Sequence, residues 1–258
     1  MHLPIRVIRL ALTLMVLCSI VSNAAAFEVH GDIAIKWQSL GGQKGFLGAP
    51  LTNETAAPDG VGRYNHFEHG SIYWRPNSKA FEIHGFIRDK WASLGWERSF
   101  LGYPLSDELG TGDGRGRISS FQHGAIVWTA ETGARVIYGD VRTKWTELGA
   151  GSGFLGYPVE DEKIAPDKVG RYVHFEHGTI YWSKATGAHE VHGFIRDKWA
   201  KLAWERGRMR YPTSDEYQWG EYRRSNFQGG FITWKKGEGA TASGPIDSGT
   251  ALNPVDDD

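Results

Sequence analysis

The chain is built on a 54-residue repeat whose most regular part is a Leu-Gly-x-Pro loop. The loop occupies residues 47–50, 101–104 and 155–158, and a degenerate copy, Met-Arg-Tyr-Pro, occupies residues 209–212. Periods of this size are typical of repeat arrays and propellers, in which each unit is one supersecondary motif packed on its neighbours. The repeat predicts four units, numbered here 1 to 4: 27–80, 81–134, 135–188 and 189–240.

Each unit has the pattern of a short helix followed by strands. In unit 2, Ile87, Trp91 and Leu94 recur at helical spacing, and Gly95 suits the C-cap. Gly and Pro in the loop restrict its backbone to a defined turn. The second half is rich in aromatic and β-branched residues around a Gly turn, which predicts a hairpin plus a third strand. We therefore expect an α+β repeat fold.

The third strand that completes each hairpin lies, in sequence, at the start of the next unit. The fourth hairpin, 227–234, has no following unit, whereas residues 27–30 precede the first helix without a hairpin. We therefore expect residues 27–31 to pair with the fourth hairpin and close a propeller-like ring, which would hide the exposed edges. Residues 241–258, which end in three Asp, are expected to form a disordered acidic tail.

Residues 1–26 have the features of a secretory signal peptide. Arg6 and Arg9 form a positive region, residues 10–21 are apolar, and residues 24–26 are all Ala. The apolar run is short for a bilayer, so we expect an exported chain that does not span the membrane. Cys18 is the only cysteine and lies in this segment, so the mature chain would have no disulfide and no thiolate site.

The charge balance gives no reason to expect a nucleic-acid or anionic-membrane partner. The formal net charge is −1, with 29 basic and 30 acidic residues. Electrostatic binding to phosphates needs a clear excess or clustering of Lys and Arg. We expect the protein to have no nucleic-acid partner. We also expect it to be a monomer.

The repeats resemble the LGFP repeat family, which is named for this loop. The resemblance covers residues 27–240 and includes a Lys-Trp pair in each helix, a Glu four residues after each loop Pro, and the hairpin pattern Phe-x-x-Gly-x-Ile-x-Trp. Unit 4 departs from it, with Met209 and Arg210 in place of Leu and Gly and Gly229 in place of a His. The resemblance implies a secreted cell-surface module, found alone or beside enzymes, that attaches to cell-wall polysaccharide.

Tryptophan occurs in two kinds of position. Two sets recur in every unit, and we expect them in the core because every unit has the same packing problem; they are Trp37, Trp91, Trp145 and Trp199, and Trp74, Trp128, Trp182 and Trp234. Trp96 and Trp204 occur only after the helices of units 2 and 4, beside Arg98 and Arg206. Their faces are candidates for stacking on sugars, with the charged neighbours bonding hydroxyls; partly exposed Trp without a function is the alternative.

One strand face of the odd units offers a second group of candidate glycan contacts. Strand alternation places the side chains at positions 64, 66 and 68 on one face. With their counterparts in unit 3, these residues are Tyr64, His66, Glu68, Tyr172, His174 and Glu176. A solvated strand face is the alternative. His66 and His69 point to opposite faces and match no zinc motif, so we expect no metal site.

Each unit also carries one Arg and one Glu that form a natural pair. We expect structural bridges, with anchors for a carboxylated sugar as the alternative; the pairs are Arg63–Glu54, Arg117–Glu108, Arg171–Glu162 and Arg223–Glu216. Neighbouring carboxylates such as Asp107 and Glu108 lack the separation and unlike environments that glycoside hydrolysis requires. There is no Gly-x-Ser-x-Gly motif. We therefore expect no catalytic residues, no enzyme activity and no cofactor.

Together these patterns predict a secreted, cell-wall-associated binding module without catalytic activity. Its partner would be cell-wall or surface polysaccharide, held through several weak, similar sites whose linkage raises the overall affinity. Two alternatives from other classes stay open: a secreted hydrolase that acts on glycans, and an adhesion or inhibitor module that binds a protein.

Overall fold

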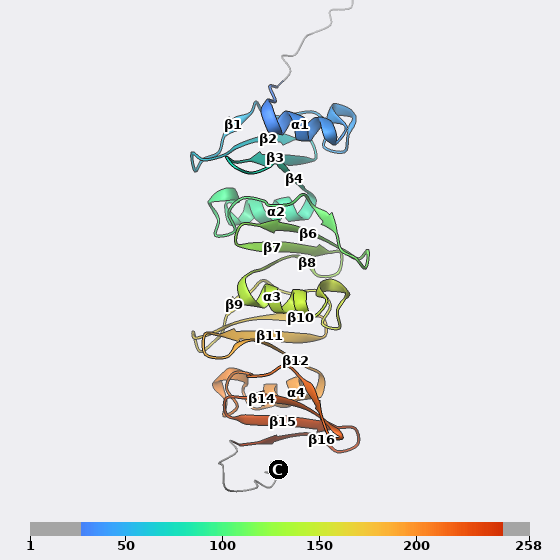
Figure 1. Ribbon diagram of the computed structural model, residues 1–258, viewed down its shortest axis with the longest axis vertical. Helices are drawn as coiled ribbons and strands as arrows, with labels where there is room; N and C mark the ends of the chain where they lie inside the picture. The colour runs from blue at the N-terminus through green and yellow to red at the C-terminus, as the bar shows by residue number, and fades with distance from the viewer. Residues whose placement is uncertain (1–26, 245–258) are drawn as a thin grey trace, which may run out of the picture.

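The four predicted units stack end to end in an open column. The computed structural model describes residues 27–244, so the expected signal peptide and residues 245–258 lie outside the described part. In Figure 1 the units follow one another along the long axis, with the first at one end and the fourth at the other. The chain is therefore an α+β repeat array.

Each unit begins with a short α-helix, which is followed by a single 3₁₀ turn. The helices are α1 (Gly31–Ser39), α2 (Gly85–Leu94), α3 (Gly139–Glu147) and α4 (Gly193–Lys201), followed by η1 (Gly42–Lys44), η2 (Trp96–Arg98), η3 (Ala150–Ser152) and η4 (Trp204–Arg206). The predicted apolar stripe is confirmed, because Ile87 and Trp91 are the buried residues of α2 and Gly95 is its left-handed C-cap. Gly85 is the first residue of that helix and has a φ of +51°, a left-handed conformation that favours glycine.

The rest of each unit is a four-stranded antiparallel meander, and its last strand contains residues that the sequence division gave to the next unit, so each structural unit runs from its helix to the strand before the next helix. The strands are β1 (Thr55–Ala56), β2 (Arg63–Phe67), β3 (Gly70–Trp74), β4 (Phe81–His84), β5 (Leu109–Gly110), β6 (Gly116–Phe121), β7 (Gly124–Thr129), β8 (Gly133–Ile137), β9 (Lys163–Ile164), β10 (Arg171–Phe175), β11 (Gly178–Ser183), β12 (Gly187–His192), β13 (Tyr217–Trp219), β14 (Tyr222–Phe227), β15 (Gly230–Lys235) and β16 (Gly239–Ser243). The hairpin and third strand are as predicted. The short first strand of each sheet was not.

The expected ring is wrong, because the fourth sheet is completed by its own last strand. β16 pairs with β15, with Phe231 opposite Ser243, and its last three residues, 241–243, were assigned to the acidic tail. Residues 27–30 form no strand and lie on unit 1 instead. The Glu28 amide donates to Asn53 Oδ1 at 2.9 Å, and the Glu54 amide donates to the Glu28 carbonyl at 2.8 Å. The N-terminal segment thus lies at the opposite end of the column from the fourth hairpin (Figure 1).

Each inner helix is packed between two sheets, which makes the core of the column continuous. The α2 core contains Tyr73 and Ile83 from the sheet of unit 1, together with Phe121 and Ile126 from the sheet of unit 2. Trp91 lies between them at 0% exposure, and Trp145 and Trp199 occupy the same place in α3 and α4. Trp37 is only partly buried, because no sheet precedes α1.

The second tryptophan set does not form the core. Trp74, Trp128, Trp182 and Trp234 are only partly buried. Trp128 is covered by Phe86 of the same unit in a stacked arrangement, 5.3 Å between ring centroids, and Trp234 is covered by Phe194 in the same way. These pairs therefore lie at the surface of the two even units.

The Leu-Gly-x-Pro loop joins the helix to the sheet of its own unit. Leu47 and Leu101 are fully buried, and Met209 takes the same place in unit 4 at 0% exposure. Trp91 Nε1 donates to the carbonyl of Gly102 at 3.2 Å, which ties the loop to the helix. Pro50 forms a bridge with Phe67 at the hairpin turn. The loop therefore shapes the unit.

Ion pairs between neighbouring units hold the column together. A helix lysine in each of the first three units reaches an aspartate in the loop of the next unit: Lys36–Asp107, Lys90–Asp161 and Lys144–Asp215. The other oxygen of each aspartate accepts the amide of the preceding sheet's last strand, as Asp215 does from Glu190 at 3.0 Å. Each aspartate thus binds both a helix and a strand of the unit before it.

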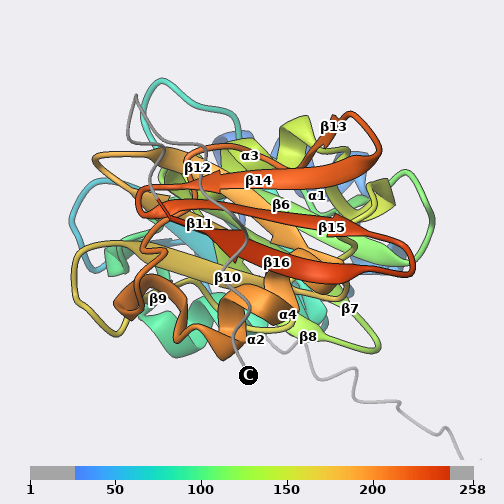
Figure 2. The ribbon, with the colours of Figure 1, turned by 90° about the horizontal axis from the view of Figure 1, so that it is seen from below.

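Successive units face opposite ways, and the two ends of the column differ. The loops at the tips of the sheets project to the left in units 1 and 3 and to the right in units 2 and 4 (Figure 1). At the C-terminal end, sheet β13–β16 closes the column (Figure 2). On this sheet the Arg224 guanidinium lies 3.8 Å from the Phe231 ring centroid. At the other end, α1 exposes Ile35.

Candidate functional site

Trp96 and Trp204 are held in an unfavourable backbone conformation. Their φ angles are +59° and +55°, in the left-handed region. The same position is Gly42 in unit 1 and Ala150 in unit 3, at +59° and +51°. A bulky residue in this region costs roughly 1–2 kcal/mol, and such strain gathers at functional sites. The even units therefore carry a tryptophan where the fold prefers glycine.

The structure brings the two groups of sugar-contact candidates together at the junction of units 1 and 2. Trp96 lies 5.4 Å from the ring of His66 and stacks on Tyr73 at 6.0 Å, with 20° between the planes. Tyr64 in turn stacks on Tyr73 at 5.1 Å. Candidates that are about 30 residues apart in the sequence thus form one aromatic group. We call Tyr64, His66, Tyr73 and Trp96 the first junction cluster.

The junction of units 3 and 4 repeats this arrangement. Trp204 lies 6.0 Å from His174 and stacks on Tyr181 at 6.3 Å, with 14° between the planes. Tyr172 stacks on Tyr181 at 5.0 Å. We call Tyr172, His174, Tyr181 and Trp204 the second junction cluster. Since units 1 and 3 face the same way (Figure 1), the two clusters lie on the same side of the column.

An arginine from the even helix supports each cluster. The Arg88 guanidinium lies 5.2 Å above the Trp96 ring, and Arg88 Nε donates to Ser71 Oγ at 2.7 Å. Ser71 Oγ also lies 2.7 Å from His66 Nδ1. Because arginine only donates, the serine hydroxyl is left to donate its own proton to a neutral imidazole. Burial, and then the charge of Arg88, lowers the pKa of His66 to about 4.

This histidine predicts an acid-sensitive fold. A group whose pKa falls from 6.5 in the unfolded chain to about 4 in the fold contributes stability that is lost as the pH drops from 6.5 through 4. His174 acts in the same direction, whereas ion pairs with Glu82 and Glu190 raise the pKa of His84 and His192 and give the opposite slope. We expect His66→Asn, the residue that unit 4 carries, to lose less stability than the native chain between pH 7 and pH 4. Chemical unfolding at both pH values measures this, and equal losses would contradict the assignment.

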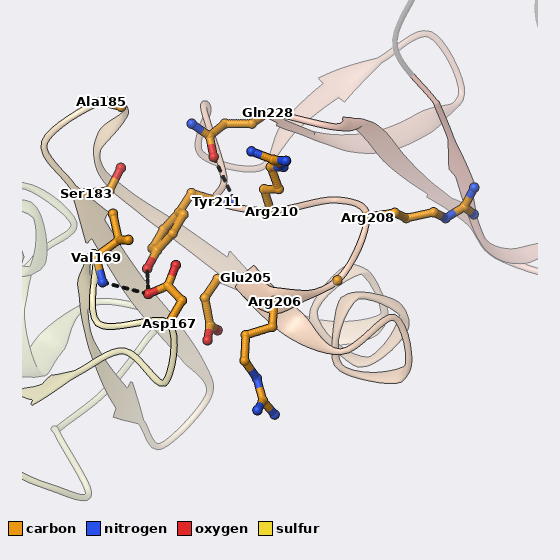
Figure 3. Close-up of a pocket in the computed structure, with 11 residues that line it drawn as sticks. Asp167, Val169, Ser183, Ala185, Glu205, Arg206, Arg208, Arg210, Tyr211 and Gln228 are labelled. Atoms are coloured by element: carbon orange, nitrogen blue, oxygen red, sulfur yellow. Dashed lines mark hydrogen bonds between the residues drawn. The ribbon is translucent and has the colours of Figure 1, made fainter.

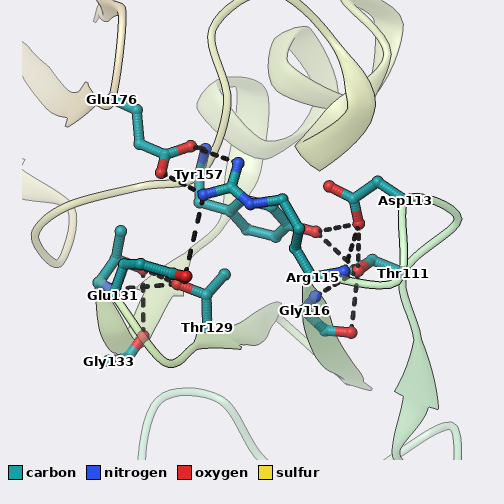
Figure 4. A network of polar contacts seen from close by, with 10 residues as sticks. Thr111, Asp113, Arg115, Gly116, Thr129, Glu131, Gly133, Tyr157 and Glu176 are labelled. Carbon is teal, nitrogen blue, oxygen red and sulfur yellow. Dashed lines mark hydrogen bonds and ion pairs between the residues drawn. The ribbon is translucent and has the colours of Figure 1, made fainter.

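The junction of units 2 and 3 has no such cluster. Ser120 and Val127 stand where the odd units carry His and Tyr, and Ala150 replaces the tryptophan. The Tyr157 hydroxyl lies 2.6 Å from Thr111 Oγ1 and donates to Asp113 at 2.7 Å (Figure 4), a contact between units that the other two junctions also have. The candidate sites are therefore limited to two of the three junctions.

The structure corrects the assignment of Glu68 and Glu176. Both lie in the hairpin turn after the strand ends, so they leave the face of the junction clusters. Glu68 accepts the amide of Ala49 in the Leu-Gly-Ala-Pro loop at 2.9 Å. Glu176 accepts the equivalent amide of Tyr157 and pairs with Arg115 at 2.7 Å (Figure 4). Both glutamates therefore brace the loop of their own unit, and Glu176 also binds the unit before it.

The other charged candidates divide between surface and structure. Arg98 and Arg206 are exposed, and neither makes a ring contact with the clusters among the contacts of residues 27–244. The expected bridges within units are confirmed: Arg117 and Arg223 each donate to their glutamate at 2.9 Å, Arg63 pairs with Glu54, and Arg171 lies 3.9 Å from Glu162. The glutamate of each pair is almost fully buried, which favours the structural interpretation over a sugar anchor.

A cavity beside the second junction cluster was not predicted. It has a volume of about 610 Å³, and its lining includes Asp167, Glu205, Arg206, Arg210 and Tyr211 (Figure 3). It lies at the loop where unit 4 departs from the repeat. The departure itself, Arg210 in place of glycine, was visible in the sequence; the approach of Asp167 from unit 3 was not.

Comparison with known proteins identifies the family. The profile of the LGFP repeat matches residues 47–99, 101–153 and 155–207, which is more than half of the chain. The protein is therefore a member of the LGFP repeat family. No curated protein matches the chain. In residues 27–244, no helix is long and apolar enough to cross a bilayer.

Proposed function

We propose that this protein is a secreted, non-catalytic module that attaches to cell-wall or surface polysaccharide through its two junction clusters. The observation that carries the proposal is the strained tryptophan, Trp96 or Trp204, placed twice over a His/Tyr platform. Each indole is partly exposed, and aromatic faces suit the apolar C–H face of a sugar ring. The neighbouring imidazole adds a polar group at the same place.

The repetition of the cluster supports a polymeric ligand. Two weak sites on one rigid column bind a polymer that reaches both more tightly than either binds alone, because the second contact becomes intramolecular. The continuous core and the lysine–aspartate pairs fix the distance between the sites. We propose that residues 1–26 direct export, which places the column at the cell surface.

Retention on insoluble wall polysaccharide tests this function. The mature chain is incubated with wall polysaccharide stripped of protein, and bound protein and released reducing ends are both measured. We expect retention without release of sugar. Release of reducing ends would favour the hydrolase, and retention only on protein-containing walls would favour a protein partner. Either result would overturn the proposal.

A further inference from the structure

Two glutamates beside the junction tryptophans are buried without a partner. Glu97 and Glu205 are 6% and 4% exposed. By hydrogen-bond geometry, none of their four carboxylate oxygens has a partner in the described part of the chain, although Glu205 lies close enough to the Tyr181 hydroxyl to contribute, after burial, to the raised pKa of that tyrosine. Burying a carboxylate without donors is strongly unfavourable, and natural proteins normally pair such groups. The missing donors are therefore expected from a ligand.

A second carboxylate stands beside each of them. Figure 3 shows Asp167 next to Glu205, and both line the 610 Å³ cavity. Asp167 Oδ1 accepts the Tyr211 hydroxyl at 2.6 Å and the Val169 amide at 2.9 Å, which fixes the aspartate as a carboxylate acceptor. In unit 1, Asp59 is held the same way by Tyr103 at 2.7 Å and by the Val61 amide at 2.9 Å. It lies close to Glu97, because burial and then the charge of Asp59 raise the pKa of that glutamate. The same pair of a glutamate and an aspartate thus occurs at the junction of units 1 and 2 and at the junction of units 3 and 4.

The fold itself does not require the glutamate of each pair, whereas the aspartate recurs at all three junctions as Asp59, Asp113 and Asp167. At the position of Glu97 and Glu205, unit 3 has Gly151 and unit 1 has Gln43. A Cβ at Gly151 would lie 2.3 Å from the ring of Tyr157, which fills the space there. The buried acid therefore occurs only where a junction tryptophan precedes it.

We propose that each acid pair, Glu97 with Asp59 and Glu205 with Asp167, binds the primary ammonium group of an amino sugar whose ring stacks on the adjacent tryptophan. The inference rests on the proposed function and names its ligand class. An ammonium group supplies three donors and a positive charge, which two carboxylates accept. In unit 4, Arg206 and Arg210 also line the cavity, and their donors suit hydroxyl or carboxylate oxygens of the same sugar.

Two oligosaccharides that differ only in acetylation test this ligand class. The intact mature protein is titrated calorimetrically with a glucosamine tetramer and with an N-acetylglucosamine tetramer at pH 6. Hydrogen bonds to charged groups are worth about 1.5–3 kcal/mol, so we expect the free amine to bind about tenfold or more tightly. In the double variant Glu97→Gln/Glu205→Gln this preference should disappear, while the affinity for the acetylated tetramer stays the same.

Asp197→Asn, a change of an exposed acid on α4 outside the cavity, serves as the matched control and should keep the preference. Thermal melting of each variant checks the fold; glutamine keeps the volume and removes a buried unpaired charge. Equal affinity of the native chain for the two tetramers, or a preference that survives in the double variant, would overturn the inference alone. Binding of neither tetramer, together with no retention on wall polysaccharide, would overturn the proposed function as well.

Discussion

The double variant Trp96→Gly/Trp204→Gly is expected to lose retention on wall polysaccharide. Glycine is the natural residue at this position in unit 1, at the same φ, so the substitution keeps the backbone and removes only the indole. A tryptophan at the centre of a binding site commonly contributes about 2 kcal/mol, or about 30-fold in affinity. The double variant should lose more than either single variant, because two linked sites raise each other's occupancy. Binding isotherms on insoluble polysaccharide measure the three affinities.

Phe86 and Phe194 provide the matched control for this result. They are exposed aromatic residues of the same two units, 62% and 61% accessible, and they stack on Trp128 and Trp234 rather than on the clusters. Phe86→Ala/Phe194→Ala should retain native binding. Loss of binding in this control, or native binding in the tryptophan variant, would place the binding surface elsewhere on the column.

The second large effect concerns stability: Trp145→Ala should destabilise the protein far more than Trp37→Ala. Trp145 is 1% exposed between two sheets, and its Nε1 donates to the Gly156 carbonyl at 2.9 Å. Large-to-small changes of this kind in a core cost about 3–5 kcal/mol. Trp37 occupies the same helix position but has a sheet on one side only, so it loses fewer contacts.

Guanidinium unfolding curves of the two variants compare these losses directly. Because the column is held by contacts between neighbouring units, a break at the central junction should also reduce the cooperativity of unfolding, seen as a lower slope or as two transitions. Equal free-energy losses for the two variants would show that the second sheet contributes little to helix burial.

Within a unit, local sequence patterns were sufficient to predict most of the fold. The helix follows from apolar residues at helical spacing, and the hairpin follows from alternation on both sides of a glycine turn. The Arg–Glu bridges follow from one pair per unit. The two-residue first strands, such as Thr55–Ala56, were missed because so short a segment has no periodicity.

The arrangement of the units relative to one another could not be predicted from local sequence patterns. β16 is made of Gly, Ala, Thr and Ser, a composition that resembles a tail, and its pairing with β15 decides between a ring and a column. Glu68 was misplaced by extending the strand alternation one residue too far, into the turn.

The candidate site was predicted in parts rather than as a whole. The exceptional position of Trp96 was evident from its presence in even units only, and the Tyr64/His66 face from its presence in odd units only. Their contact depends on the half-turn between successive units and on the preceding sheet covering the next helix. Neither property is encoded locally. The acid pairs were hidden for the same reason, since Asp59 and Glu97 belong to different units.

Because the junctions of such a column are of two kinds, the column is expected to lengthen by pairs of units rather than by single units. Odd sheets present Tyr and His to an even helix with Arg and Trp, whereas the sheet of unit 2 presents Ser120 and Val127. An extra single unit would bring two unlike surfaces together. A duplicated block of residues 81–188, placed before unit 4, would repeat the junction of units 2 and 3 and add one between unit 3 and the second copy of unit 2, which again joins an odd sheet to an even helix. Growth in pairs would add one junction cluster for every two units, so the number of sites and the length of the protein rise together.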